Sequence, residues 1–401
     1  MQIESFPSGW NPFDYQPRTR LVFGANSVER VGSLATEIAC KRVLLVTDKG
    51  IATAGHAARV ERLLQTAGLG VVTYAGVHEN PTTRDVDDCV RVARAAGIDL
   101  LVGLGGGSSM DTAKGCNFIL TNGGQMKDYW GVGKAAKPML PLIAIPTTAG
   151  TGSECQSAAL IADEHTHQKM ACLDPKVAAR VAILDPELTM SQPPRVTACT
   201  GIDAIAHAVE TAVTKKRNPL SLMLSHEAFK LAVTAFERVI SHPLDIEARG
   251  RMLLGAAFAG TAIENSMLGA THSAANPLTA HFGVVHGQAV GMMLPAVIRF
   301  NAQEPSARRA YAELASAPEI ACVSDGEAEA VEALIARLER LLNLAGMPRS
   351  LADCGVRREA IPALAAEAAQ QWTATFNPRK VTVEDFARLY EAAFQRRGNG
   401  A

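Results

Sequence analysis

The first half of the chain alternates short runs of aliphatic and β-branched residues with longer amphipathic stretches. Up to about residue 190 the strand-like runs include RVLLVTD, GVVTYAGV, DLLVGLG, LPLIAIPTT and ARVAILDP. Helical periodicity separates them, as in GHAARVERLLQTAGL and RDVDDCVRVARAAGI. This alternation is typical of a parallel sheet covered by helices. We therefore predict an α/β domain with a parallel sheet over residues 1–190.

The second half of the chain has helical periodicity and few β-branched runs. The change follows the Pro-rich stretch DPELTMSQPPRV, and the helical segments include SLMLSHEAFKLAVTAFERVI, DGEAEAVEALIARLERLLNLAG and TVEDFARLYEAAFQRRG. Apolar residues that recur at helical spacing predict amphipathic helices. We expect an all-α domain over residues 191–401, with a cleft between the two domains.

The charge balance narrows the class of partner. The chain has 39 basic and 40 acidic residues, which leaves no electrostatic footprint for nucleic acid or an anionic membrane surface. Its most apolar stretches, MLLGAAFAGTAI and AVGMMLPAVI, are shorter than the roughly 20 residues needed to span a bilayer. We expect small-molecule partners and a homodimer, with no nucleic-acid or membrane partner.

The cysteines and the first residues bear on location. The eight cysteines are scattered without a C-x-x-C pair, so the sequence indicates neither a disulfide framework nor a thiolate zinc site. The start, MQIESFPSGWNPFDYQPRTR, lacks the basic end and apolar core of a signal peptide. A reducing, cytoplasmic location fits best.

Two glycine-rich turns are candidate phosphate sites. LLVGLGGGSSMDTAK reads as a buried strand, a glycine turn and the first turn of a helix. Glycines let backbone N–H groups approach an anion, and a helix N-terminus favours negative charge. IPTTAGTGSE combines small residues with the hydroxyls of Thr147 and Thr148. Two such loops favour a pyrophosphate, although a glycine turn that serves packing alone stays open.

Asp48 ends the strand-like run RVLLVTD. A carboxylate there can accept hydrogen bonds from a ribose diol and repel a 2′-phosphate, which would favour NAD over NADP. In the dinucleotide fold, however, the acid follows the glycine motif by about 20 residues, whereas Asp48 precedes GGGSS by more than fifty. Spacing alone leaves a solvated turn residue or a helix cap open.

The stretch GIDAIAHAVE places Asp203 and His207 in an apolar segment that should be a buried helix. At four residues apart their side chains point about 40° from each other on one face. Buried groups of this kind must be paired, hydrogen-bonded or bound to a metal. A hydrogen bond between them inside a helical core is an equally good explanation of the pair alone.

The segment GATHSAANPLTAHFGVVHG carries three further histidines, His272, His281 and His286. His272 and His286 would be about 21 Å apart on one straight helix, too far to share a metal. Pro277 and Gly283 lie between them and can break the helix, so that His286 folds back toward His272. Such nitrogen and oxygen ligands suit Fe(II) or Zn(II).

Four motifs together resemble the iron-containing (group III) alcohol dehydrogenases. They are GGGSSMDTAK, PTTAGTGSE, TGIDAIAHAVE and the spacing of fourteen residues from His272 to the HG at His286. The resemblance extends over nearly the whole chain. It implies an N-terminal dinucleotide-binding α/β domain, a C-terminal helical domain and a divalent metal.

The resemblance also implies specific site residues. The implied metal ligands are Asp203, His207, His272 and His286. The implied NAD contacts are Asp48, Asn80, Gly106, Gly107, Ser108, Thr147, Thr148 and Lys169. Members of the family that prefer NAD carry an acid at the position of Asp48.

Asn276 is a departure from the family pattern. Many members have a second histidine four residues after the ligand, near the nicotinamide and substrate, where this chain has Asn276 in HSAANPLT. Asparagine forms hydrogen bonds but cannot transfer a proton near neutral pH. Proton transfer would then run through water and ribose hydroxyls or through His281, and Asn276 would orient the substrate. Glu210 could hold a ligand histidine or form an ordinary ion pair.

We expect an NAD(H)-dependent, metal-dependent alcohol dehydrogenase or aldehyde reductase. The metal, Fe(II) with Zn(II) as an alternative, would bind the alcohol oxygen and stabilise the alkoxide during hydride transfer to the nicotinamide. Two alternatives use the same architecture: a hydroxyacid–oxoacid transhydrogenase and a lyase similar to dehydroquinate synthase. The chain lacks an obvious basic cluster for the phosphorylated sugar acid that such a lyase would bind.

Overall fold

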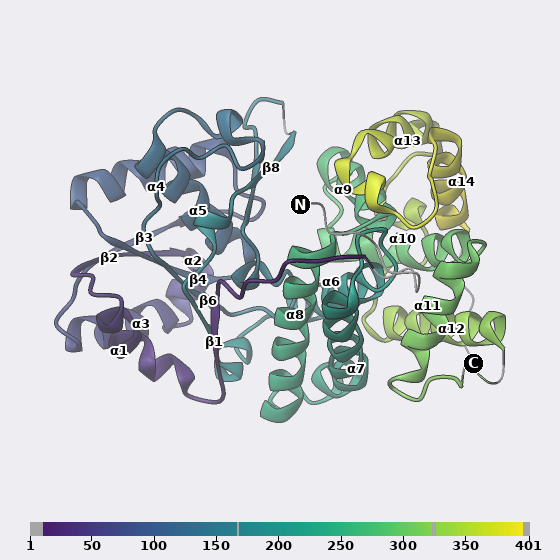
Figure 1. Cartoon of the computed structure of the whole chain (residues 1–401), viewed down its shortest axis with the longest axis horizontal. Coiled ribbons are helices and arrows are strands. Elements are labelled where there is room, and N and C mark those ends of the chain that lie inside the picture. The colour runs from purple at the N-terminus through teal and green to yellow at the C-terminus, as the bar shows by residue number, and fades with distance from the viewer. Residues whose placement is uncertain (1–10, 167, 323, 325, 396–401) are drawn as a thin grey trace. The chain divides into compact units, whose positions relative to one another are not determined.

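The computed structural model describes residues 11–166, 168–322, 324 and 326–395 (Figure 1). The described residues form two compact units. One unit comprises residues 16–192, and the other comprises residues 11–15 together with those from 193 onward. The side chain of Asn11 attaches to the second unit, because its amide donates to the backbone oxygens of Lys215 (2.7 Å) and Arg217 (2.9 Å).

The first unit is built on a six-stranded parallel sheet, as the alternation of apolar runs predicts. The strand order is β1-β9-β6-β4-β2-β3, and every neighbouring pair is parallel. The strands are β1 (Arg20–Phe23), β2 (Arg42–Asp48), β3 (Gly70–Val77), β4 (Leu100–Gly105), β6 (Leu142–Pro146) and β9 (Val181–Leu184).

Helices cover both faces of this sheet (Figure 1). They are α1 (Val31–Glu37), the short α2 (Lys49–Thr53), α3 (His56–Thr66), α4 (Thr83–Ala96) and α5 (Gly107–Asn122). Because side chains alternate along a strand, Val43 and Leu45 of β2 pack with the core under α1 and α3. Leu44 and Val46 pack on the opposite face with α4 and α5.

A second, three-stranded sheet in the first unit has the order β5-β8-β7. Its strands are β5 (Gly131–Val132), β7 (Ala158–Ala162) and β8 (Lys169–Leu173). A parallel bridge between Thr82 and Ala162 joins it to the segment before α4. Neither this sheet nor the edge strand β1 was among the predicted strands.

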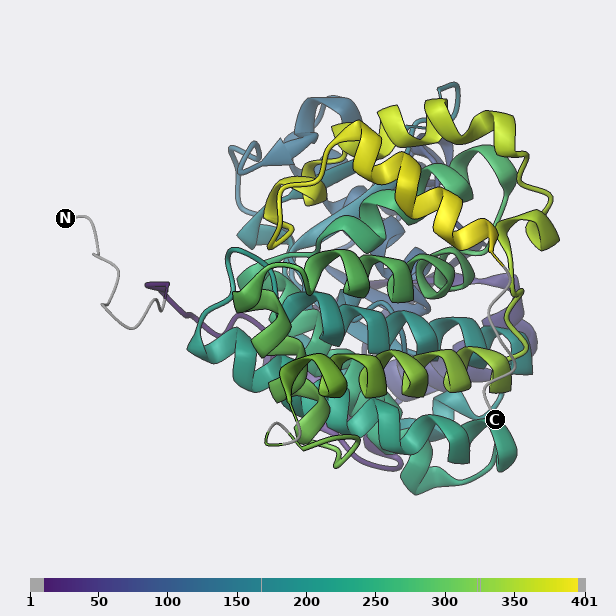
Figure 2. The same ribbon diagram turned by 90° about the vertical axis from the view of Figure 1, so that its right-hand side faces the viewer.

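The described part of the second unit is helical, as the sequence predicts, and Figure 2 shows several of its helices running side by side. The helices are α6 (Pro194–Thr211), α7 (Pro219–Ser241), α8 (Ile246–Ser266), α9 (Ala270–Phe282), α10 (His286–Asn301), α11 (Pro305–Ser316), α12 (Glu327–Leu344), α13 (Ile361–Gln370) and α14 (Val383–Phe394). Side-chain caps define several N-termini, such as Asn218 for α7 and Asp245 for α8.

Short 3-10 helices complete the connections in both units. They are η1 (Ser27–Arg30), η2 (Met126–Tyr129), η3 (Ser153–Cys155), η4 (Pro175–Val177), η5 (Pro186–Thr189), η7 (Leu351–Cys354), η8 (Arg358–Ala360) and η9 (Trp372–Phe376).

The break between His272 and His286 lies at Gly283. This glycine follows α9 with φ +63°, a left-handed conformation that suits a residue without Cβ. The expectation that Pro277 also breaks the helix is wrong, because Pro277 lies inside α9. The chain turns over Gly283–Val285 and starts α10 at His286.

No helix in the part of the chain that the structure describes is both long enough and apolar enough to cross a membrane.

Candidate metal centre and anion-binding turns

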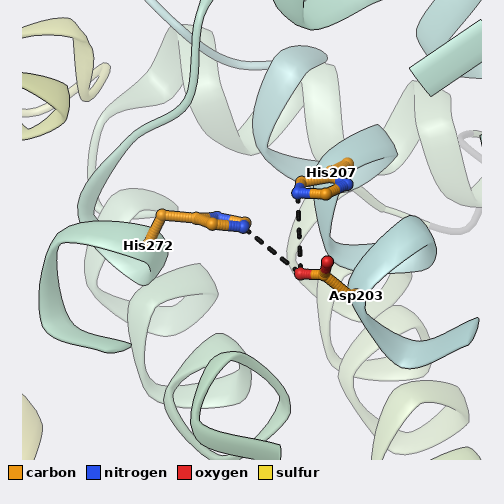
Figure 3. Close-up of side chains that lie close together, drawn as sticks. All are labelled: Asp203, His207 and His272. Carbon is orange, nitrogen blue, oxygen red and sulfur yellow. Dashed lines mark ion pairs between the residues drawn. The ribbon is translucent and has the colours of Figure 1, made fainter. Parts of the chain in front are cut away.

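Three histidines of the helical unit converge on one buried carboxylate oxygen, Oδ1 of Asp203. Asp203 and His207 lie one turn apart on α6, His272 is the third residue of α9 and His286 is the first of α10. Oδ1 of Asp203 lies 3.5 Å from Nε2 of His207, 3.4 Å from that of His272 and 3.9 Å from that of His286. Figure 3 shows His207 and His272 pointing toward Asp203 from separate helices.

The spacing of these atoms fits a shared metal ion. The donor atoms of Asp203, His207 and His272 all lie within 4.8 Å of one another. Donors about 2.1 Å from one tetrahedral ion are about 3.4 Å apart. Oδ1 of Asp203 and Nε2 of His272 are also buried, and neither makes a hydrogen bond in the described structure. A buried polar atom without a hydrogen bond is energetically costly unless a ligand binds it. The cluster therefore fits a divalent metal.

The electrostatics of the cluster favour a cation. Burial raises the pKa of Asp203, but His207, His272 and His286 outweigh it and hold the pKa well below its usual range. Burial lowers the pKa of His272, but Glu210 and Asp203 outweigh it and raise the pKa to about 9. His272 would therefore have to give up a proton before it could bind a metal.

Glu210 holds His272 from the side away from Asp203. Its Oε2 is hydrogen-bonded to Nδ1 of His272, and its Oε1 accepts from the backbone N–H of Thr271 at 2.7 Å. Of the two hypotheses for Glu210 from the sequence, the structure supports the one in which it holds a candidate ligand histidine.

Asn276 and His281 lie further along α9. The amide nitrogen of Asn276 donates to Oε1 of Gln371 at 3.2 Å. His281 is on the surface, where Nε2 lies 2.5 Å from Oε2 of Glu367 and the imidazole side chain is 56% exposed.

In the α/β unit, sheet topology explains the distance in sequence between Asp48 and the glycine turn. β2 pairs in parallel with β4 in the register Val46↔Gly103, so both strands end at the same edge. A Cβ on Gly105 would lie 3.3 Å from Oδ2 of Asp48. The chain passes from β2 to β3 on one side of β2 and returns to β4 on the other. Ligands of doubly wound folds bind at such a switch point.

The two predicted anion-binding turns also meet at this edge, because β4 pairs with β6. The backbone N–H of Thr147 donates to the oxygen of Gly105 at 2.9 Å. A Cβ on Gly107 would lie 2.8 Å from Cγ2 of Thr151, and Gly105 has φ +145°. Glycine at these positions lets the two turns pack closely against each other at the N-terminus of α5. The hydroxyl of Thr147 is buried and makes no hydrogen bond in the described residues.

Other candidate cofactor residues surround the same edge. Gly106 is the N-cap of α5, Ser108 lies in its first turn, and Thr148 follows β6. Asn80 follows β3 and is exposed, with φ +52°. Lys169 starts β8 opposite Ala162, whose N–H donates to Pro81 next to Asn80.

A buried polar group between the two turns was not among the residues predicted from the sequence. Lys114 of α5 is fully buried, and Nζ donates to the oxygen (2.6 Å) and hydroxyl (2.8 Å) of Ser153 and to the oxygen of Ala158 (2.9 Å). The hydroxyl of Ser153 donates to Asp111 at 2.8 Å, and the neighbouring Glu154 is 1% exposed. The signal was present in SSMDTAKG, where charged residues interrupt an apolar helix as Asp203 does.

Comparison with known proteins gives matches over both units. A family model described as iron-containing alcohol dehydrogenase matches residues 17–186, and one described as Fe-containing alcohol dehydrogenase family, C-terminal, matches residues 197–394. The chain is 35% identical over 372 residues to NAD-dependent methanol dehydrogenase of Bacillus methanolicus, covering 93% of this chain and 97% of that protein. Lactaldehyde reductase of Escherichia coli K12 is 34% identical over 369 residues, covering 91% and 96%. The structure of alcohol dehydrogenase from Oenococcus oeni matches with a TM-score of 0.92 at 30% identity, covering 96% and 100%.

Proposed function

Because the chain belongs to the iron-containing alcohol dehydrogenase family, we propose that its two groups of polar residues carry metal-assisted hydride transfer between a small alcohol or aldehyde and NAD(H). The chain is an NAD-dependent alcohol dehydrogenase or aldehyde reductase, as relatives such as methanol dehydrogenase and lactaldehyde reductase indicate. The observation that carries the proposal is the buried cluster of Asp203, His207 and His272.

In this proposal Asp203, His207, His272 and His286 hold the divalent metal, which is Fe(II) with Zn(II) as the alternative. A bound ion of this kind supplies a Lewis acid that lowers the pKa of an alcohol hydroxyl. Asp203 contributes the one negative charge among the four donors and keeps it, because the surrounding histidines lower its pKa. The imidazoles contribute neutral nitrogens that fix the position of the ion.

The α/β unit binds NAD through the edge where β2, β4 and β6 end. The N-terminus of α5 at Gly106, Gly107 and Ser108 and the hydroxyls of Thr147 and Thr148 receive the pyrophosphate. Asp48 accepts hydrogen bonds from the adenine ribose and repels a 2′-phosphate. Asn80 and Lys169 complete the set, and NAD supplies the hydride acceptor.

Asn276 orients the substrate in this proposal, while His281 has no assigned step. The asparagine amide cannot act as an acid or a base near neutral pH, so Asn276 serves through its hydrogen bonds. The ion pair of His281 with Glu367 on the surface supports a structural role, and water with the ribose hydroxyls then carries the proton.

The test is turnover by anaerobically purified protein reconstituted with Fe(II) or Zn(II), followed by NADH and NADPH absorbance on a panel of alcohols and aldehydes. We expect metal-dependent NADH turnover. His207→Ala should no longer retain the metal, and its kcat/KM should fall at least 100-fold. Its affinity for NAD should stay within about threefold of wild type. His226→Ala, on α7 of the same unit, is the matched control and should keep both.

Two results would overturn this assignment. Metal content and turnover that survive His207→Ala would exclude the proposed ligand set. Bound metal and bound NAD without net NADH change for any substrate would favour the transhydrogenase or the lyase.

We also propose a homodimer and a cytoplasmic location. β1 forms one edge of the six-stranded sheet, and Leu21 and Phe23 on it are 38% and 47% exposed. An exposed sheet edge is a ready template for pairing with a second chain. Light scattering should give a molar mass in solution of twice the chain mass. The variant Leu21→Lys should lower this measured mass toward that of one chain. The eight free cysteines support the reducing compartment.

A further inference from the structure

We propose that Glu210 is the positioning residue of the metal centre: it fixes the ring orientation and the tautomer of His272. The inference rests on the proposed function, since it concerns how one proposed ligand is held. Glu210 itself binds no metal in this proposal and acts only through His272.

The position of Glu210 on α6 follows from helix geometry. It lies three residues after His207 and seven after Asp203, so all three point to nearly the same side of the helix. Its side chain is 4% exposed. A buried carboxylate requires strong hydrogen bonds to offset its lost hydration, and each oxygen of Glu210 has one.

The two oxygens of Glu210 bind different parts of α9. Oε1 accepts from the backbone N–H of Thr271 at 2.7 Å, and Oε2 is bonded to Nδ1 of the next residue, His272. A neutral imidazole that keeps its proton on Nδ1 presents a lone pair on Nε2. Nε2 is the atom that lies 3.4 Å from Oδ1 of Asp203. Glu210 therefore turns the lone pair of His272 toward the centre.

A neighbouring contact separates support of the helix from support of the imidazole. Oδ1 of Asn377 accepts from the backbone N–H of Ala270 at 3.1 Å, and Asn377 is 1% exposed. Its Nδ2 donates to Asn301 at 2.7 Å. Asn377 and Glu210 thus both cap the first turn of α9, but of these two contacts only that of Glu210 includes the ring of His272.

Gly269 leaves room for both acceptors. A Cβ there would lie 2.9 Å from Oδ1 of Asn377 and 3.2 Å from Oε1 of Glu210. The glycine before α9 thus permits a cap made by two distant side chains in place of its own.

The experiment compares Zn(II) affinity and thermal unfolding for wild type, Glu210→Gln and Asn377→Ala, using competition with a chelator. Glu210→Gln keeps the size of the side chain and one acceptor for Thr271, but it loses the charge and the fixed acceptor for Nδ1. Loss of such a partner typically weakens metal binding 10- to 100-fold. We expect that loss for Glu210→Gln and at most a threefold loss for Asn377→Ala, while both lower the Tm.

The outcomes separate this inference from the proposed function. Wild type that binds no zinc would overturn the metal centre itself. Wild-type binding with an unchanged affinity in Glu210→Gln, or an equal loss in Asn377→Ala, would overturn only the role of Glu210 and leave a structural cap.

A second measurement needs no variant. In zinc-loaded wild type with ¹⁵N-labelled histidine, the proton on Nδ1 of His272 should exchange slowly with water. Exchange as fast as that of the surface residue His281 would contradict the proposal even if Glu210→Gln does not fold.

Discussion

Glu154 is buried in η3, and its Oε1 makes no hydrogen bond in the described structure. Burial raises its pKa from 4.5 to about 7, against the opposing effects of a backbone hydrogen bond and Lys114. Because the folded pKa lies above the unfolded one, the protonated form stabilises the fold. This contribution is present in full below pH 4.5 and is lost as pH rises toward 7, by about 3 kcal/mol.

Urea unfolding of wild type and Glu154→Gln between pH 4.5 and 8 measures this effect. The amide cannot ionise, so the variant should gain stability relative to wild type as pH rises. Parallel curves for the two proteins would show that Glu154 does not titrate in this range.

Asp48 allows a test of cofactor choice that leaves the helix intact. Its Oδ1 caps α2 by accepting from the N–H of Ile51 at 3.0 Å, and asparagine is an equally good N-cap. Asp48→Asn therefore removes the charge but keeps the cap. We expect the ratio of kcat/KM for NAD to that for NADP to fall about tenfold, or about 1.4 kcal/mol, with the Tm nearly unchanged. An unchanged ratio would place the 2′-position away from Asp48.

At the residue scale, candidate site residues could be identified from the sequence where a polar side chain interrupts an apolar stretch. Asp203 and His207 stand out in an apolar helix, and the structure buries both. The proximity of Asp48 to Gly105 could not be predicted from spacing, since it depends on which strands are neighbours. The interaction of Lys114 with Ser153 was equally hidden, because its partner lies 39 residues away.

The close crossing of α6 and α10 requires a residue without a Cβ at Gly287. A Cβ on Gly287 would lie 2.0 Å from the backbone oxygen of Cys199, so Gly287→Ala must push the two helices apart. His286 precedes this glycine, whereas Asp203 and His207 lie on α6. The variant should weaken Zn(II) binding at least tenfold.

Gly291→Ala, one turn later on α10, is the matched control for this crossing. Its Cβ would lie 2.6 Å from Cδ2 of Leu342 and 2.7 Å from Cγ2 of Ile202. Both are side-chain methyl groups and not backbone atoms, so the variant tests overpacking at the same crossing without a backbone clash. Zinc affinity by chelator competition should stay within threefold of wild type. Equal losses in the two variants would show that general strain controls metal binding.

At the element scale, long periodic segments were predictable and short ones were not. α6, α7, α12 and α14 all appear where the period indicated. β1 has four residues and β5 has two, too few to show a period, and their pairing partners are remote in sequence. Pro277 was misjudged because proline usually ends a helix, whereas here α9 continues to Phe282.

At the scale of the whole molecule, the proposed metal and NAD residues belong to different units. A ligand at 100 times its Kd stabilises the structure that binds it by about 2.7 kcal/mol. Hydrogen exchange should therefore slow most in α6, α9 and α10 on adding Zn(II), and in the turns after β2, β4 and β6 on adding NAD. Slowing by zinc that is confined to residues 16–192 would contradict the proposed ligand set.

The contacts of Asn11 set an order for folding during synthesis. Its partner Lys215 follows 204 residues later, and a ribosome adds roughly 5–20 residues per second. The first described residues therefore wait roughly 10–40 s for the segment they bind. Residues 16–192 have been synthesised before Lys215. The α/β unit can therefore reach its native fold while Asn11, which precedes it, still lacks the segment that it binds.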